Sequence, residues 1–245
     1  MKKNSARPQG IQAIPAYSAL CRIPESIIQA ATNEGIGACA YAFACQCALI
    51  FRILLALCWR FSVLRGCMIT GPRPSVFKAC LSPMEAESAP NWVMEVLAAN
   101  PDAMFWQFKF EGHLKSRFVQ GIFPQQLSSL LEEFLAVHRP LLVGIGNDDP
   151  GTLLVTRKGR AFSNRGFREL IHLLTGRFFG NRVSGQGFRR AFAIAWLRAN
   201  QDDYLTLARI LWIRKVERTI QLYFTPRSNI DILPKLEGWM KHNSK

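Results

Sequence analysis

The chain has 245 residues, and its 31 lysines and arginines outnumber its 17 aspartates and glutamates, which gives a net charge of +14. This length is enough for one large domain or two small ones with a substantial core. So large a positive excess favours a polyanionic partner, either nucleic acid or an anionic membrane surface, over an ordinary soluble protein with a basic surface. Arginines recur from Arg157 to Arg227 between apolar helix positions. This distribution favours a structured basic groove and argues against a disordered basic arm.

All the cysteines lie in the first third of the chain. They are Cys21, Cys39, Cys45, Cys47, Cys58, Cys67 and Cys80. None forms a C-x-x-C pair and no histidine lies among them, so we expect no zinc site. An odd number of cysteines without a cleavable signal predicts reduced thiols in a cytoplasmic protein. We therefore expect these residues to act as small buried hydrophobes.

The N-terminal part combines a polar segment with a long apolar one. Residues 1–34 are polar and interrupted by three prolines, so we expect this segment to be poorly structured. Residues 36–59 are apolar except for Gln46 and Arg52 and are long enough to cross a bilayer, which needs about 20 residues. An arginine inside such a span costs about 2.5–3.5 kcal/mol on insertion scales. We therefore favour a buried core helix and expect no membrane partner, while a membrane anchor is a second interpretation.

The middle of the chain alternates between strand and helix patterns. Aromatic-rich residues 103–110 and 117–123 are predicted to form two strands, with Lys115 at or beside the tip of the hairpin between them. Pro124 then opens an amphipathic helix. Residues 153–156 are predicted to form a short strand, and Ser163 or Asn164 to cap the next helix. The predicted fold class is α+β, mostly helical with a small antiparallel sheet.

The segment from Gln186 to Tyr223 contains two apolar patterns at helical spacing. A polar turn at residues 200–203 separates them, and Pro226 ends the second pattern shortly after Tyr223. An arginine at the start of one helix and a tyrosine 34 residues later, as Arg189 and Tyr223 are spaced, are suited to meet over a phosphate.

Common enzyme motifs are absent from the sequence. It has no P-loop, no G-x-G-x-x-G after a strand, no H-E-x-x-H and no G-x-S-x-G. The four histidines are scattered without metal-ligand spacing. We therefore expect neither a metal ion nor a cofactor.

One pattern is not excluded by this search. An arginine, a lysine, a second arginine and a tyrosine follow one another along the chain, at Arg60, Lys115, Arg189 and Tyr223. Arg60 stands in "WRFSVL" after an apolar helix, Lys115 in "GHLKSRF", Arg189 in "QGFR" and Tyr223 at the end of "LWIRKVERTIQLY". In these residues the chain resembles the catalytic domain of the tyrosine recombinase (phage integrase) superfamily over roughly residues 40–230.

The resemblance implies that Tyr223 attacks a DNA phosphodiester and that Arg60 and Arg189 clamp the transition state. Lys115 would act as the general acid; Lys109 and Lys78 are the alternatives for this role. Two positions depart from the family.

Gln186 stands where the family has its first histidine, and Ile213, or Arg214 in a shifted alignment, stands where it has the second. A shift of one residue would likewise exchange Arg189 with Arg190. We expect Arg190, Arg214 and Lys215 to contact DNA phosphates.

The resemblance also implies an organisation and a setting. Residues 35–230 would form the catalytic domain and residues 231–245 a C-terminal helix or tail, without the N-terminal helical domain that usually completes the clamp around DNA. The partner would be double-stranded DNA, bound by a homo-oligomer in the nucleoid of the cytoplasm.

Three functions stay open on the sequence. The first is a site-specific recombinase or integrase of a mobile genetic element. The second is a non-catalytic DNA-binding relative, because neither Gln186 nor Ile213 can exchange protons, and the loss of one such group reduces rates about 10²–10⁴-fold. A membrane protein anchored by residues 36–59 is a third.

Overall fold

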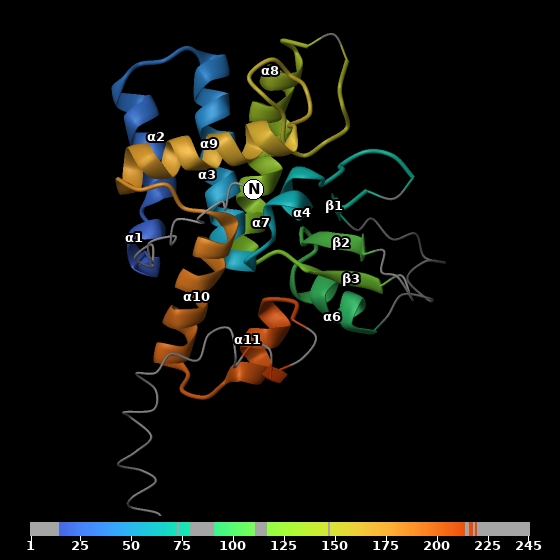
Figure 1. Ribbon diagram of the computed structural model, residues 1–245. Coiled ribbons are helices and arrows are strands. Elements are labelled where there is room, and N and C mark those ends of the chain that lie inside the picture. The colour runs from blue at the N-terminus through green and yellow to red at the C-terminus, as the bar shows by residue number, and fades with distance from the viewer. Residues whose placement is uncertain are drawn as a thin grey trace, which may run out of the picture. The chain divides into compact units, whose positions relative to one another are not determined.

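The computed structural model describes residues 15–72, 74–78, 91–110, 117–146, 148–213, 216, 217 and 219 (Figure 1). The chain divides into two compact units, and each is described by itself. The larger unit is Ser18–Gly185, and the smaller one combines Met1–Tyr17 with Gln186–Lys245.

Helix α3 (Ala38–Leu57) forms the core of the larger unit. It packs against α2 (Ile23–Asn33), α7 (Gln125–Glu133), the π-helical segment η1 (Phe134–His138) and α8 (Arg139–Val143). By length and composition alone α3 is able to cross a membrane, but 61% of its most apolar window is buried inside the protein. This burial favours a core helix over a membrane span.

Both polar residues of α3 find partners within the protein. The side-chain amide of Gln46 donates to the carbonyl oxygen of Val155 at 2.7 Å and accepts from the Val155 N–H at 2.9 Å. Arg52 Nη2 lies 3.1 Å from Glu25 Oε1 on α2. These contacts explain how an otherwise apolar helix contains an amide and a guanidinium without a buried unsatisfied group.

A three-stranded antiparallel sheet belongs to the same unit. Its strands are β1 (Val76–Lys78), β2 (Met104–Phe110) and β3 (Arg117–Ile122), in the order β1-β2-β3. β2 and β3 pair from Phe105↔Ile122 to Phe110↔Arg117, so the predicted two strands are confirmed. With the sheet beside the helices (Figure 1), the α+β class is confirmed as well.

Aromatic side chains cover both faces of the central strand β2. On one face the Phe105 ring stacks on Phe77 and lies 6.2 Å from Trp92 of helix α6 (Asn91–Ala99). On the other face the Trp106 ring meets Trp59 edge-on at 5.5 Å. The strand is therefore fixed from both sides.

The segment between α8 and α9 (Asn164–Phe179) differs in part from expectation. Ser163 caps α9, its Oγ accepting from the Gly166 N–H at 3.0 Å, as predicted. The strand predicted at residues 153–156 is wrong, since only isolated bridges occur there, Met68↔Thr152 and Val155↔Ala161. The reason is that the backbone of Val155 bonds the Gln46 side chain rather than a strand.

Two expectations for the N-terminal third need correction. Residues 1–34 were expected to be poorly structured, yet α2 lies within this range and buries Ile23, Ile27 and Ala31. Pro24 does not prevent the helix because it occupies the first turn, where its missing N–H is not needed. Cys21 and Cys39 are exposed and are not core residues, whereas Cys47, Cys58 and Cys67 are buried as expected.

The smaller unit contains α10 from Gln186 onward and α11. Helix α10 spans Gly185–Ala199 and α11 spans Tyr204–Ile210, which confirms the two predicted helices and their polar turn. Asp203 caps α11, with Oδ1 accepting from the Thr206 N–H at 3.1 Å. Tyr17, the first residue of α1 (Tyr17–Leu20), places its ring edge-on against Phe192 of α10.

Candidate functional site

Arg60 is presented at a sharp turn between two helices. Helix α3 ends at Leu57, and its C-cap residue Cys58 has a left-handed φ of 50°. Trp59 is then buried to 2% exposure, and Arg60 is exposed as the first residue before α4 (Phe61–Arg65). The turn therefore buries the indole and leaves the next side chain, a guanidinium, in solvent.

The sheet holds this turn in place. Besides Trp106, the Trp59 ring meets Phe108 of β2 edge-on at 4.8 Å and Phe123 at 5.6 Å. The carbonyl oxygen of Arg60 accepts from the N–H groups of residues 63 and 64 at 3.0 and 3.1 Å. The backbone of Arg60 is thus fixed on both sides.

The guanidinium of Arg60 has no hydrogen-bond or ion-pair partner among the residues that the structure describes. Some other exposed cations of this unit are neutralised by a carboxylate, as Arg177 is by Glu34 at 2.7 Å. An exposed, fixed and unneutralised arginine is suited to bind a phosphate with two parallel hydrogen bonds.

Arg189 lies in a different environment. It is only 7% exposed on α10, and its Nη2 donates to the carbonyl oxygen of Leu211 at the end of α11. Gln186 stands three residues earlier, so it shares the same side of the helix, and it is exposed in the first turn. Arg190 is exposed. The start of α10 therefore places one buried guanidinium beneath an exposed amide.

Ile213, which the resemblance places at the second histidine position, follows α11. The Ile213 N–H donates to the carbonyl oxygen of Ala208 at 2.8 Å, and the side chain is half-buried. An isoleucine can pack here but cannot hold or release a proton.

The other predicted site residues lie outside the described part of the chain. Lys115 falls in the connection between β2 and β3, and Arg214, Lys215 and Tyr223 follow α11. Arg60 belongs to the larger unit, whereas Gln186, Arg189 and Arg190 belong to the smaller one. The convergence of the four principal side chains therefore stays a prediction.

Lys78 and Lys109 are the alternatives to Lys115 as the general acid, and of these two the structure describes the side chain of Lys78. Its Nζ forms ion pairs with Asp102 and, at 3.0 Å, with Glu132. The hydrogen bond that Lys78 donates to Asp102, followed by the one that it donates to Glu132, raises the pKa of Lys78. A lysine with a raised pKa releases its proton less readily, so Lys78 is poorly suited to act as a general acid. Lys109 lies in β2, opposite Phe118.

Sequence reasoning missed the support beneath Arg60. The aromatic residues of β2 were expected only to form a strand, and Trp59 was one apolar residue among many. No spacing rule joins Trp59 to a strand more than 40 residues later. In the described ranges, no group of three or more His, Cys, Asp or Glu side chains is arranged to hold a metal ion.

Comparisons with known proteins show what this fold is similar to. No protein-family model and no curated protein matches the chain. Among solved structures, XerH site-specific recombinase bound to palindromic difH substrate in a post-cleavage complex is similar, with a TM-score of 0.54 and 14% identity over 94% of this chain and 56% of that one. Its pre-cleavage complex with difH has a TM-score of 0.54 and 15% identity, over 93% of this chain and 55% of that one.

XerA recombinase is also similar, with a TM-score of 0.49 and 18% identity over 90% of this chain and 63% of that one. The chain spans about half the length of the XerH chains. The likeness to XerH confirms the predicted recombinase-like fold.

Proposed function

We propose that this chain is a DNA-binding, site-specific recombinase that cuts and rejoins DNA strands with Tyr223 as its nucleophile. The observation that carries the proposal is the fold shared with XerH, a recombinase whose structures contain its DNA substrate before and after cleavage. The exposed, unneutralised guanidinium of Arg60 at a rigid turn supports it. The net charge of +14 suits a polyanionic substrate.

The cleavage step would form one phosphoester and break another. The Tyr223 oxygen attacks the phosphorus of a backbone phosphodiester, and its proton passes to solvent. The bond from phosphorus to the 5′ oxygen breaks, which leaves a phosphotyrosyl link and a 5′ hydroxyl. Rejoining reverses the same exchange, so no external energy source is needed.

Two arginines and a lysine would supply the electrostatics. The transition state carries additional negative charge on its non-bridging oxygens, which Arg60 and Arg189 would stabilise. Lys115 would donate a proton to the leaving 5′ oxygen. Gln186 would donate a hydrogen bond from its amide to a phosphate oxygen, as a neutral substitute for histidine.

A second candidate function is DNA binding without cleavage. Its specific support is the replacement of both proton-exchanging positions by Gln186 and Ile213. The half-buried Ile213 offers only an apolar surface where a proton donor would be expected.

The proposal also covers the extent of the catalytic domain, its DNA contacts, its oligomeric state and its location in the cell. Residues 35–230 would form the catalytic domain, and Arg190, Arg214 and Lys215 would contact DNA phosphates. The chain would act as a homo-oligomer on double-stranded DNA in the cytoplasm.

The decisive experiment traps the covalent intermediate. Duplexes that the protein retains from a randomised pool are nicked near the bound site, so that cleavage releases a short fragment and cannot reverse. A DNA–protein adduct that survives denaturing electrophoresis is expected for the unmodified chain. It should be absent for Tyr223→Phe and present for Tyr204→Phe, the matched tyrosine control.

The same DNA separates the two functions. If binding is retained and falls steeply with salt but no adduct forms, the catalytic proposal is rejected and the binding function stands. A salt-independent or undetectable interaction with duplex DNA would reject both. Arg60→Gln should abolish the adduct, whereas Arg22→Gln, at another exposed arginine, should not.

A further inference from the structure

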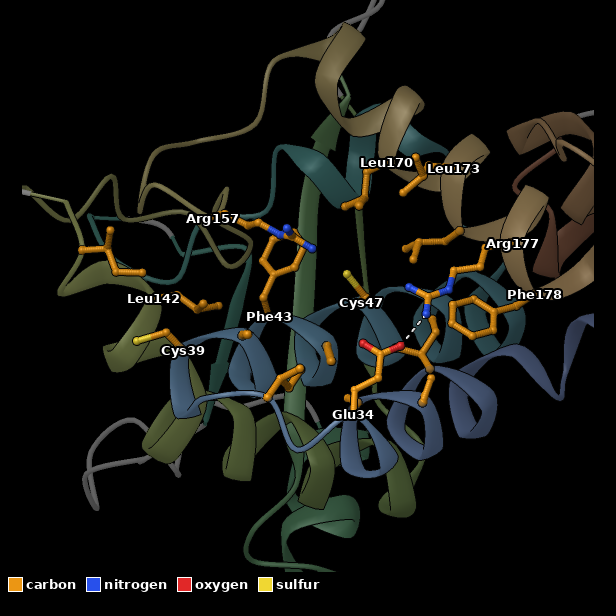
Figure 2. Close-up of a pocket in the computed structure, with 18 residues that line it drawn as sticks. Glu34, Cys39, Phe43, Cys47, Leu142, Arg157, Leu170, Leu173, Arg177 and Phe178 are labelled. Atoms are coloured by element: carbon orange, nitrogen blue, oxygen red, sulfur yellow. Dashed lines mark hydrogen bonds and ion pairs between the residues drawn. The ribbon is translucent and has the colours of Figure 1, made fainter.

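The larger unit contains a cavity of about 480 Å³ that the proposed function does not use (Figure 2). It lies between α2, α3, the end of α8 and α9. Its walls are mainly apolar, formed for example by Ile27, Phe43, Cys47, Leu142 and Leu174. This volume and this lining are typical of pockets for small organic molecules, which range from about 300 to 1,000 Å³.

Two arginines line the cavity, and they differ in their partners. Arg177 forms an ion pair with Glu34 at 2.7 Å, so its charge is neutralised. The guanidinium of Arg157 lies over the Phe43 ring, 4.9 Å from its centroid, and no carboxylate pairs with it in the described part of the chain. In Figure 2 Arg157 lies above the Phe43 ring, away from the Glu34–Arg177 pair. The cavity therefore carries one net positive charge.

The contact with Phe43 leaves Arg157 able to bind an anion. A cation–π contact uses the flat face of the guanidinium. The N–H donors point outward from its edge, in the plane that a carboxylate requires for two parallel hydrogen bonds. Phe43 thus holds the guanidinium at the cavity and does not consume its donors.

The rim of the cavity is apolar and in contact with solvent. Leu173 of α9 is 66% exposed and Ile145, after α8, is 50% exposed, and both line the cavity. Large apolar side chains at the mouth of a pocket are covered when an apolar ligand occupies it. The occupant should therefore have an extended apolar body in addition to its anionic group.

We propose that this cavity binds a small amphipathic carboxylate, with one carboxylate against Arg157 and an apolar chain between α2, α3 and α9. The charge arrangement selects a monoanion. Arg157 offers one unneutralised cation, and the second arginine of the lining, Arg177, is already paired with Glu34.

The probe for this site is decanoate, titrated into the full-length chain by isothermal calorimetry. One molecule should bind per chain, and binding should raise the melting temperature because the ligand stabilises the folded state. Decanol has the same tail without the charge and should bind more weakly.

Two variants and a matched control locate the site. Arg157→Gln should weaken decanoate binding about tenfold, as the loss of a charge-assisted contact predicts. Ala44→Leu fills the cavity from α3 without changing charge and should abolish binding of both probes. Arg168→Gln removes an exposed arginine of α9 that does not line the cavity, so binding should be unchanged.

The site is refuted by any of three results with the folded, unmodified chain. The first is no heat of binding up to about 1 mM decanoate, the weak end of specific binding. The second is equal weakening by Arg157→Gln and Arg168→Gln, which would show a general charge effect. The third is equal affinity for decanol and decanoate, which would show that Arg157 does not bind the carboxylate.

Discussion

The indole of Trp106 lies directly over Gly121 on the neighbouring strand. The two residues face each other across the β2–β3 pair, and a Cβ at position 121 would come within 2.5 Å of Trp106 Cζ2. Trp106 in turn supports the buried Trp59, which immediately precedes Arg60. A glycine without a side chain thus permits the packing that fixes the candidate phosphate-binding arginine.

Gly121→Ala should therefore destabilise the larger unit. The added methyl group must displace the Trp106 ring, and overpacking of this kind typically lowers the free energy of unfolding by about 1–3 kcal/mol. Urea denaturation followed by circular dichroism measures the change. Gly176→Ala is the control, because nothing lies within 4 Å of a Cβ there; it should be neutral or stabilising. Equal effects of the two variants would contradict the steric argument.

The ion pair between Arg139 and Asp149 should make stability depend on pH. Arg139 Nη1 and Nη2 donate to the Asp149 carboxylate at 2.8 and 2.6 Å, and this contact holds the pKa of Asp149 below its ordinary value. A lowered pKa stabilises the fold above the unfolded-state pKa, and the stabilisation is lost as the pH falls through the folded-state pKa.

Asp149→Asn should consequently lower the melting temperature at pH 7, because buried Arg139 loses its counter-charge. The difference from the unmodified chain should shrink below about pH 4 as the carboxylate becomes protonated. Melting curves from pH 7 to 2 measure this, with Asp148→Asn as the neighbouring control. A difference that persists at the lowest pH would contradict the ion-pair explanation.

Gln46→Leu should destabilise α3 although it makes the helix more apolar. The leucine leaves both backbone groups of Val155 without the amide that pairs with them. An unsatisfied buried polar group costs about 1–3 kcal/mol. Chemical denaturation should show this loss for Gln46→Leu but not for Gln126→Leu on the exposed face of α7. A stabilised Gln46→Leu would indicate that burial of the apolar side chain outweighs the two hydrogen bonds.

Lysine substitutions should distinguish the predicted general acid, Lys115, from Lys78, one of its two alternatives. Lys78 is engaged by Asp102 and Glu132 on an exposed surface, where such pairs contribute little to stability. Lys78→Ala should therefore retain adduct formation on nicked DNA, whereas Lys115→Ala should reduce its rate about 10²–10⁴-fold. Single-turnover cleavage rates measure both. A large loss for Lys78→Ala alone would transfer the catalytic role to Lys78.

Local patterns accounted for much of the fold. The helix at residues 38–57 follows from a long apolar run and the helix at residues 164–179 from apolar spacing. The Ser163 cap follows from one side chain and a backbone N–H three residues away. The β2–β3 hairpin has the same local character. The interactions that define these elements join residues close in sequence, and so their signals are visible there.

For the candidate site, the sequence predicted only the types of the residues and their order along the chain. Arg60, Lys115, Arg189 and Tyr223 were identified by residue type and neighbouring sequence. The bond from Arg189 to Leu211 and the pairing of Lys78 with Asp102 and Glu132 were not, because they join separate elements. The strand at residues 153–156 was wrongly predicted for the same reason, because the backbone of Val155 bonds Gln46 on a separate element.

The sequence by itself determined most of the helices and the β2–β3 hairpin, the excess of positive charge, and the residue types available for phosphate chemistry. Only the tertiary structure decided that Gln46 bonds Val155, 109 residues away, and that Trp106 packs over Gly121 beneath Trp59. It also decided that Arg157 remains unneutralised at an apolar cavity. Helix periodicity and capping are short-range and repeat along the chain, whereas side-chain partners are set by which surfaces pack together in three dimensions.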